Sequence, residues 1–457
     1  MERFNLQYSR KNIPIPSRHE YKLLLTAKTE SLIKRMRWKA LQYLGHLQPS
    51  EKKTYGFRSR KCPPVVKEMK DFEDSLWNLV RNIEFRAVQN NFQDKMKQDI
   101  QSIKQSPKLV VPADKSTNLY KMDKDEYTNH LVNNITRAYK KARGTKQEAI
   151  NKEAYEIAKK LDLEDRMQCL QTSEAFITVK DHKEGFPANP SFRLINPSKT
   201  DIGRISKAIL DRINKELLGR TNVNQWKSDK EVIGWFKGIT NKRAYTFIKF
   251  DIDNFYPSIS LELFNKAIAY ARRFVDISEE DLEIIMLARK TLLFHKEEPW
   301  TKRNNEDDFD VPMGSYDGAE VCELIGAFML DELSGIIDRK DIGLYRDDGL
   351  GIMGRIGGPE IERRKKKIIQ TFKKHRLDIT VQTKLKEVDY LDIEFDLNND
   401  TFKPYRKPNN DPLYVNKKSN HPPSVLKQIP KGIGKRLSEL SSSEEIFKAA
   451  APQYEEA

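Results

Sequence analysis

The sequence has 457 residues, 38% hydrophobic and 33% charged, which is too apolar for a disordered chain and long enough for two or three domains or one large multi-lobed enzyme. It has no apolar run of about 18 residues and no apolar N-terminal signal segment. We therefore expect no membrane span, no secretion, and residence in the nucleus, the cytoplasm or both. Three scattered cysteines without a Cys-x-x-Cys pair argue against a disulfide framework and a zinc knuckle.

The net charge of +15 is unevenly distributed. Residues 1–70 contain 17 Lys/Arg against 5 Asp/Glu, and residues 401–436 contain 9 against 1, whereas residues 71–400 have a net charge of −1. Two basic segments that flank a near-neutral centre suit a protein that grips a polyanion at two surfaces. Two solvated basic faces without a ligand would give the same pattern.

The first predicted elements are helical. Apolar spacing predicts a helix over Glu20–Leu44 and, after Pro63-Pro64, one long amphipathic helix from Val65 to near Ser106. Short β-type runs follow at Leu109–Pro112, Phe176–Lys180 and Phe192–Ile195, with a helix over Glu148–Leu163 that resembles a spacer.

From Tyr245 onward, strands and helices alternate. The pattern predicts a strand over 246–252, helices near Leu261–Phe274, Glu279–Phe294, Val321–Leu330 and Pro359–His375, a β-hairpin over 341–352, and further strand residues over 388–397. This mixture predicts an α+β domain with an antiparallel sheet.

Two adjacent acids, Asp347 and Asp348, lie at the tip of the predicted hydrophobic hairpin. Like charges so close raise each other's pKa unless a cation neutralises them, although an ordinary Asp-Asp-Gly turn has the same sequence. Upstream, Asp251 ends a buried-type strand, and Tyr256 follows five residues later. Carboxylates on neighbouring strands can share two Mg²⁺ or Mn²⁺ ions, and oxygen ligands argue against zinc. Asp253 is the main rival of Asp251 as a ligand.

Other chemistries lack support. The seven histidines have no metal-binding spacing, and neither a Gly-x-x-x-x-Gly-Lys-Ser/Thr loop nor a Gly-x-Gly-x-x-Gly loop is present, which argues against ATPase and dinucleotide functions. Between the acids, Gly314 lies in a turn before an apolar helix, where its backbone can approach a ligand closely.

Three motifs follow in order: Asp251 with its aromatic, then Pro312-x-Gly314, then Tyr345-x-Asp347-Asp348. Over roughly 176–396 they resemble reverse transcriptase motifs A, B and C. Other segments resemble Penelope-like retroelements, the lineage close to telomerase. These are Val111–Ser116 (their Asp-Lys-Gly, with Ser116 for Gly), Thr178–Lys183 with Phe192–Ile195 (their Pro-Lys-x-His-Lys and Arg-Pro-Ile block), Met313-Gly314-Ser315, and Tyr390–Ile393 (their Phe-Leu-Asp-Val).

The resemblance implies a right-hand polymerase. A basic helical region (1–107) would precede fingers (108–243), a palm with an antiparallel sheet (244–398) and an incomplete thumb (399–457). The implied activity is RNA-directed DNA synthesis, a two-metal nucleotidyl transfer to a primer 3′-OH, with an RNA template, a DNA primer and dNTPs as partners and Mg²⁺ or Mn²⁺ as the two ions.

The resemblance also implies roles for single residues. Asp251 and Asp347 would hold the metal ions, with Asp348 as a weaker third carboxylate. Tyr256 would exclude a 2′-OH, Lys180 and Arg193 would hold the triphosphate, and Gly314 would flank the templating base pair. Lys384 or Lys386 would donate a proton to pyrophosphate, and the sequence does not choose between them. The expected nucleic-acid contacts are Lys417, Lys418, Lys427, Lys431, Lys435 and Arg436.

Two departures from the family pattern stand out. Arg346 occupies a position that is usually small or apolar, and we hypothesise that it contacts primer phosphate. No GIY-YIG endonuclease motif follows the thumb-like segment, so we expect either a copy that lacks the nuclease or a nuclease on another product.

The sequence leaves two other readings open. A catalytically inactive, domesticated RNA-binding scaffold would keep the fold, but it has no physical need for acids at Asp251, Asp347 and Asp348. An RNA-dependent RNA polymerase would share the two-metal chemistry, but Tyr256 leaves little room for a 2′-OH.

Overall fold

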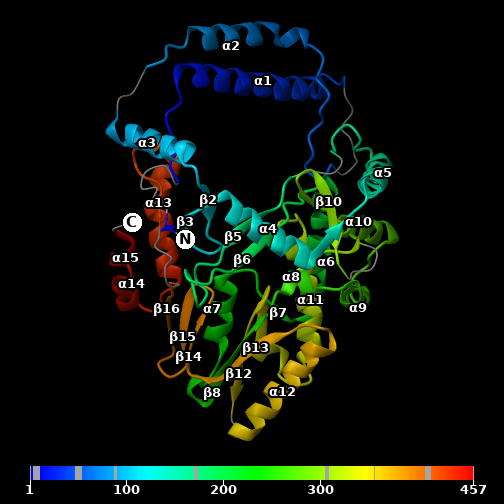
Figure 1. Ribbon diagram of the computed structural model, residues 1–457, viewed down its shortest axis with the longest axis vertical. Helices are drawn as coiled ribbons and strands as arrows, with labels where there is room; N and C mark the ends of the chain where they lie inside the picture. The colour runs from blue at the N-terminus through cyan, green and yellow to red at the C-terminus, as the bar shows by residue number, and fades with distance from the viewer. Residues whose placement is uncertain are drawn as a thin grey trace.

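The computed structural model describes residues 2–3, 11–46, 54–86, 90–168, 173–303, 308–354, 356–406 and 413–455 (Figure 1). It contains the mixture of helices and strands that the sequence predicts. Within these ranges, no helix combines the length and apolar character that a membrane crossing requires.

A five-stranded sheet forms the centre of the molecule. Its order is β13 (Ile379–Leu385), β8 (Tyr245–Ile252), β12 (Asp348–Gly354), β11 (Ile342–Tyr345) and β7 (Asn224–Gln225). All neighbours are antiparallel except β11 and β7. Residues alternate between the two faces of a strand, so β8 contributes Ile248, Phe250 and Ile252 to one apolar cluster and Phe247 to another.

Helices cover one face of the central sheet, and the large apolar cluster fills the space between them. Phe250 of the sheet packs against Phe372 with the ring centroids 5.5 Å apart. The helices that pack over this face and contribute to the cluster include α6 (Asp201–Thr221), α8 (Phe255–Ser258), α9 (Leu261–Arg272), α10 (Glu279–Arg289), α11 (Gly318–Leu333) and α12 (Gly358–Lys374).

A smaller aromatic cluster covers the other face. Phe236 packs against Phe395 with centroids 4.8 Å apart, and Trp226 against Trp235 at 5.2 Å. Its elements are α7 (Asp229–Gly238) and the three-stranded sheet of β14 (Glu387–Tyr390), β15 (Ile393–Asp396) and β16 (Thr401–Pro404).

Three small sheets lie above the central sheet in Figure 1. They consist of β1 (Glu2–Arg3), β3 (Leu119–Met122) and β2 (Leu109–Pro112); of β5 (Phe176–Val179) and β6 (Phe192–Ile195); and of β4 (Tyr139–Lys141), β10 (Glu298–Lys302) and β9 (Leu293–His295). Two helices accompany them, α4 (Lys124–Ala138) and α5 (Gly144–Lys160). Single 3₁₀ turns occur at η1 (Lys67–Met69), η2 (Lys242–Ala244) and η4 (Arg339–Asp341).

The N-terminal segment, residues 11–105, contains α1 (Arg18–Tyr43), α2 (Lys70–Asn82) and α3 (Asn91–Gln105). The prediction of one long helix from Val65 to Ser106 is wrong. The backbone is extended at Ile83, and the Asn90 side chain accepts a hydrogen bond from the Phe92 N–H, which begins α3 as a separate helix. Arg37 and Glu73 join α1 to α2 through a hydrogen bond of 2.7 Å.

This segment is attached to the rest of the molecule at two places, one at each end of the pair of helices α1 and α2. At one end, the Ile13 N–H donates to the Ser419 hydroxyl at 2.8 Å, and the Gln93 amide donates to the Lys418 carbonyl at 2.8 Å. At the other, Phe57 enters the large apolar cluster and the Ser59 hydroxyl donates to Asp165 at 2.5 Å. Figure 1 shows α1 and α2 as the arch that spans the top of the view between these attachments.

Two further predictions need correction. The helix expected over Glu279–Phe294 ends at Arg289, and strand β9 takes up Leu293–His295. The helix that resembled a spacer, α5, contributes Ile150, Ala154 and Ile157 to the large apolar cluster. The chain ends in α13 (Pro423–Glu439), α14 (Glu444–Ala450) and α15 (Pro452–Glu455).

A fully buried ion pair, Arg289 with Asp317, ties three helices together. Both side chains are 0% exposed, and the Ser206 hydroxyl donates to Asp317 at 2.6 Å. Arg289 ends α10, Asp317 immediately precedes α11 and Ser206 lies on α6. The pair therefore fixes the start of α11 and the Gly314 turn before it.

We predict that Arg289→Met lowers the free energy of unfolding by about 3–5 kcal/mol, because it leaves the Asp317 charge buried without its partner. Urea denaturation monitored by circular dichroism measures this. The double variant Arg289→Met/Asp317→Leu should recover much of the loss. A single variant as stable as the wild type would show that the pair does not hold the helices.

Candidate active site

The register of the central sheet brings three acids together. Asp251 at the end of β8 lies directly opposite Asp348, the first residue of β12. The Ile252 N–H donates to the Asp347 carbonyl at 2.9 Å, which ties the β11–β12 turn to the end of β8. Residues 96 positions apart in the sequence thus meet at one edge of the sheet.

The turn that carries Asp347 is tightly constrained. Arg346 has a φ of 55°, in the left-handed region that side chains other than glycine rarely adopt. Next to Asp348, a Cβ added at Gly349 would lie 2.1 Å from the Phe250 ring. Glycine therefore lets the strand that follows the acids pack against β8.

The electrostatics of Asp251 are those of a carboxylate without a sufficient counter-charge. Burial, then the charges of Asp347 and Asp253, raise its pKa above the ordinary value, whereas Lys115 and Lys183 act in the opposite direction. No group of three Asp, Glu, His or Cys side chains in the described ranges converges into a complete metal-ligand set. A pair of carboxylates still suits Mg²⁺, which keeps several water or substrate oxygens in its coordination sphere.

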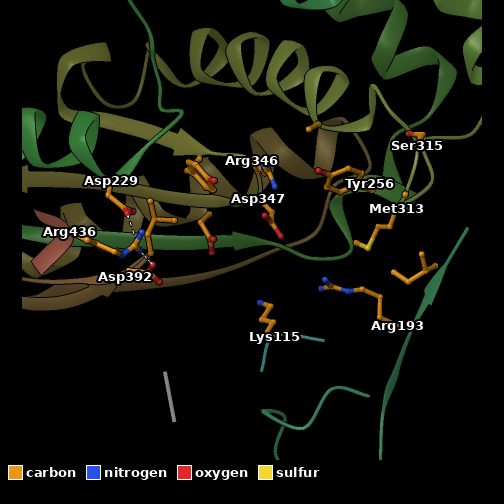
Figure 2. Close-up of a pocket in the computed structure, with 16 residues that line it drawn as sticks. Lys115, Arg193, Asp229, Tyr256, Met313, Ser315, Arg346, Asp347, Asp392 and Arg436 are labelled. Carbon is orange, nitrogen blue, oxygen red and sulfur yellow. Dashed lines mark hydrogen bonds and ion pairs between the residues drawn. The ribbon is translucent and has the colours of Figure 1, made fainter. Parts of the chain in front are cut away.

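A cavity of about 630 Å³ opens beside these acids (Figure 2). Asp347 and Asp348 line one side of it, and Figure 2 shows Lys115 and Arg193 reaching into the space opposite Asp347. The sequence-predicted residues that line the cavity are Arg193, Tyr256, Gly314, Arg346, Asp347, Asp348 and Arg436.

Two predicted residues lie next to this lining. Asp251 lies directly opposite Asp348, which lines the cavity, on the neighbouring strand. Lys180 is half-buried, and burial followed by the nearby Arg193 cation lowers the pKa of its ammonium. Arg193 is itself held by Asp114, with 3.0 Å between the guanidinium and the carboxylate.

Tyr256 lies in the wall of the cavity. A Cβ added at Gly318 would be 3.2 Å from its ring, so the absence of a side chain there lets the ring pack on the start of α11. Burial, followed by the electrostatic effects of Cys322 and Asp347, raises the pKa of the Tyr256 hydroxyl far above its ordinary value, and Arg346 opposes them. The ring therefore presents an uncharged, fixed surface to whatever the cavity holds.

Gly314 also lines the cavity, in the turn before α11. Its φ is +117°, and an added Cβ would lie 2.4 Å from the Asn196 carbonyl oxygen, so a side chain does not fit. The Asn196 N–H donates to the Met313 carbonyl at 3.2 Å. This contact joins the turn to the end of β6, the strand that carries Arg193.

Arg436 has partners that sequence reasoning did not find. Its guanidinium pairs with Asp392 and lies 3.6 Å from Asp229 (Figure 2). Burial and the Asp392 charge raise the pKa of Asp229, and Arg436 opposes them. The basic helix α13 is thus bound to the edge of the cavity by acids from α7 and from the turn between β14 and β15.

The remaining predicted residues lie outside the cavity lining. Lys386 donates to the Arg243 and Tyr245 carbonyls at the far end of β8, and Lys384 lies 4.0 Å from Glu362, so neither lysine faces the acids. Five lysines are exposed on α13 or on the segment before it: Lys417, Lys418, Lys427, Lys431 and Lys435.

We predict that Mn²⁺ raises the melting temperature of the wild type and that Asp251→Asn and Asp347→Asn abolish this shift, because each removes a charged ligand. Differential scanning fluorimetry measures it. Asp253→Asn is the matched control and should keep the shift, since Asp253 lies beyond the end of β8. If Asp253→Asn abolishes the shift and Asp251→Asn keeps it, the rival ligand is the correct one.

Without metal, Asp251→Asn should raise the melting temperature at pH 7. The folded state raises the pKa of this carboxyl, so its charged form lowers stability as the pH rises through that pKa, and a neutral amide removes the penalty. Well below the ordinary pKa of an aspartate, variant and wild type should melt alike. A lower midpoint for the variant at pH 7 would contradict this account.

The comparisons with known proteins concern the fold. No family model and no curated protein matches the sequence. Among solved structures, telomerase from Candida albicans in complex with a fragment of telomeric RNA matches with a TM-score of 0.52 and 11% identity, over 89% of this chain and 73% of that one. Apo telomerase from Candida tropicalis matches with a TM-score of 0.45 and 12% identity, over 88% of this chain and 78% of that one. The RNA-dependent RNA polymerase of a human picobirnavirus matches with a TM-score of 0.40 and 10% identity, over 87% of this chain and 77% of that one. The first match shows that this chain has an overall fold like that of telomerase, a nucleic-acid polymerase fold.

Proposed function

We propose that this protein is an RNA-directed DNA polymerase of the Penelope-like retroelement type. The observation that carries the proposal is the pairing of Asp251 with Asp348 beside Asp347, at a cavity whose other side carries Arg193. Asp347 and Asp348 in the cavity wall, with Asp251 on the neighbouring strand and cations opposite, suit a substrate that is a polyphosphate bound with a divalent ion. In this reading, residues 108–243 are the fingers, 244–398 the palm and 399–457 the thumb.

Asp251 and Asp347 are the residues that would hold Mg²⁺, with Asp348 beside them. The bound ions would supply the positive charge that activates the primer 3′-OH and stabilises the departing pyrophosphate. Two features of the chain fit this role: the raised pKa of Asp251 indicates an unbalanced negative charge, and the backbone bond from Ile252 to Asp347 keeps the two carboxylates at one place.

The chain's own cations and walls would position the nucleotide. Arg193 offers a planar set of donors, of which Asp114 uses only part, so phosphate oxygens can still be bound. Lys180 adds a second positive charge beside it. Gly314 would let the backbone approach the base pair, because a side chain there does not fit.

Tyr256 would select the sugar. Its ring is fixed against Gly318 and Cys322 at the cavity wall, a surface that suits a deoxyribose and collides with a 2′-OH. This observation favours DNA synthesis over RNA synthesis.

The basic surfaces would hold the template and primer. The exposed lysines of residues 417–435 and the net charge of +12 over residues 1–70 suit contacts with phosphates rather than with bases. The telomerase of similar fold was solved with a telomeric RNA fragment, which supports RNA as a partner. Arg346 lines the cavity beside the acids and remains our candidate for a primer phosphate contact.

Primer extension on a poly(rA)/oligo(dT) hybrid with Mg²⁺ or Mn²⁺ and dTTP tests the proposal. We expect extension by the wild type and none above background by Asp347→Ala, with hybrid affinity unchanged in a binding assay. If the wild type binds the hybrid in a salt-sensitive manner but never extends it, the protein is an RNA-binding scaffold with a polymerase fold.

For Tyr256→Ala we predict a fall of about tenfold or more in the preference for dTTP over UTP, because the variant no longer obstructs the 2′-OH. Tyr256→Phe is the matched control and should keep the preference, since the ring and not the hydroxyl forms the wall. The ratio of kcat/KM values for the two nucleotides is the measurement. Equal preference in Tyr256→Ala and wild type would remove Tyr256 from this role.

A further inference from the structure

The loop between β2 and β3, residues 113–118, brings a lysine to the cavity that sequence reasoning did not assign. Lys115 is exposed and lines the cavity, and Figure 2 shows it extending toward the side that carries Asp347. In the described part of the chain, no ion pair joins Lys115 to an acidic side chain.

The backbone on either side of Lys115 is fixed. The Ala113 N–H donates to the Asn118 carbonyl at 2.9 Å, which closes the loop, and the Asp114 N–H donates to the Val179 carbonyl at 2.8 Å. The second bond attaches the loop to the end of β5. The Asp114 side chain, 6% exposed, also pairs with Arg193. The contacts of Asp114 therefore fix the positions of both the Lys115 backbone and the Arg193 guanidinium.

A buried carboxylate, Asp181, organises the other half of the loop. Its side chain is 2% exposed, and one of its oxygens accepts hydrogen bonds from the Ser116 hydroxyl at 2.6 Å, the Asn118 amide at 2.9 Å and the Tyr120 hydroxyl at 3.0 Å. Burial and this contact raise the pKa of Tyr120 to about 12, so it remains a donor. These three bonds all reach Oδ2, whereas Oδ1 is buried without a hydrogen-bond partner among the described residues. Since burying a carboxylate is costly, the three donors to Oδ2 favour the loop conformation that supplies them.

Ser116 links the loop to Asp181. Its hydroxyl is one of the three donors to that carboxylate. The serine therefore adds a bond between the loop that carries Lys115 and the segment that carries Lys180. Both lysines are held relative to Arg193 by the same two carboxylates, Asp114 and Asp181.

We infer that Lys115 is a further phosphate-binding residue for the incoming nucleotide and that Asp181 is the positioning residue that holds it. This inference rests on the proposed function and names a residue of the same site. A lysine ammonium suits this place because it is a mobile point charge that can follow the terminal phosphates, whereas Arg193 is fixed by Asp114.

The first test compares Lys115→Met with Lys124→Met, which removes an exposed lysine from the first turn of α4, outside the cavity lining. In primer extension, Lys115→Met should raise KM for dTTP about tenfold and change kcat much less, because the lost contact is to a charged group present in the ground state. Lys124→Met should match the wild type. A KM unchanged in Lys115→Met overturns the inference.

A binding measurement separates this inference from the proposed function. Isothermal titration with dTTP in the presence of Ca²⁺ needs no turnover, so it reports on Lys115 even if the wild type extends no primer. We expect about tenfold weaker binding by Lys115→Met than by Lys124→Met. Equal affinities would exclude Lys115 as a phosphate contact whatever the enzyme activity proves to be.

The role of Asp181 has its own signature. Asp181→Ala should raise KM for dTTP in the wild-type background but add little to Lys115→Met, because both changes remove the same contact. Ser116→Ala removes one of the donors to Asp181 without leaving a cavity. It replaces Asp181→Ala in this test if that variant folds poorly. It should raise KM in the same direction and to a smaller extent. Fully additive effects of Asp181→Ala and Lys115→Met, or an unchanged KM in Ser116→Ala, would contradict the positioning role.

Discussion

The pairing of β8 with β12 is the constraint on which the site depends. Two acids that repel each other, Asp251 and Asp347, are held at one edge of the sheet because Asp251 lies opposite Asp348 and the Ile252 N–H binds the Asp347 carbonyl. The sheet can enforce this arrangement because both of its faces are packed, by Phe250 on one side and Phe247 on the other. The fold thus holds a charge arrangement that is unfavourable on its own, and a divalent cation would neutralise it.

On the other side of the cavity, the fold holds cations in place instead of acids. Buried carboxylates, Asp114 and Asp181, hold the segments that carry Lys115, Lys180 and Arg193, so the acids there serve to place cations. At the edge, Asp229 and Asp392 bind Arg436 of α13. A cavity lined by both carboxylates and cations suits a polyphosphate bound with a divalent ion better than it suits a free cation or a free anion.

Much of the central region could be predicted from the sequence, because local patterns decide it. The runs Leu109–Pro112 and Phe192–Ile195 are strands with the predicted bounds, and the hairpin with Asp347 at its turn follows from apolar residues on both sides of two acids. The apolar pattern does not reveal the break before α3, since the break depends on one capping residue, Asn90, inside an otherwise periodic stretch. Arg436 and Lys115 could not be placed, because their surroundings come from distant segments that only tertiary structure brings together.

A crystal of the protein with a primer–template hybrid, a dideoxy-terminated primer, dTTP and Mn²⁺ would test the central claim most directly. The anomalous scattering of manganese locates the ion independently of the protein atoms. We predict an anomalous peak in contact with carboxylate oxygens of both Asp251 and Asp347. Manganese bound elsewhere, or a bound nucleotide with no ion between these two residues, would contradict the account.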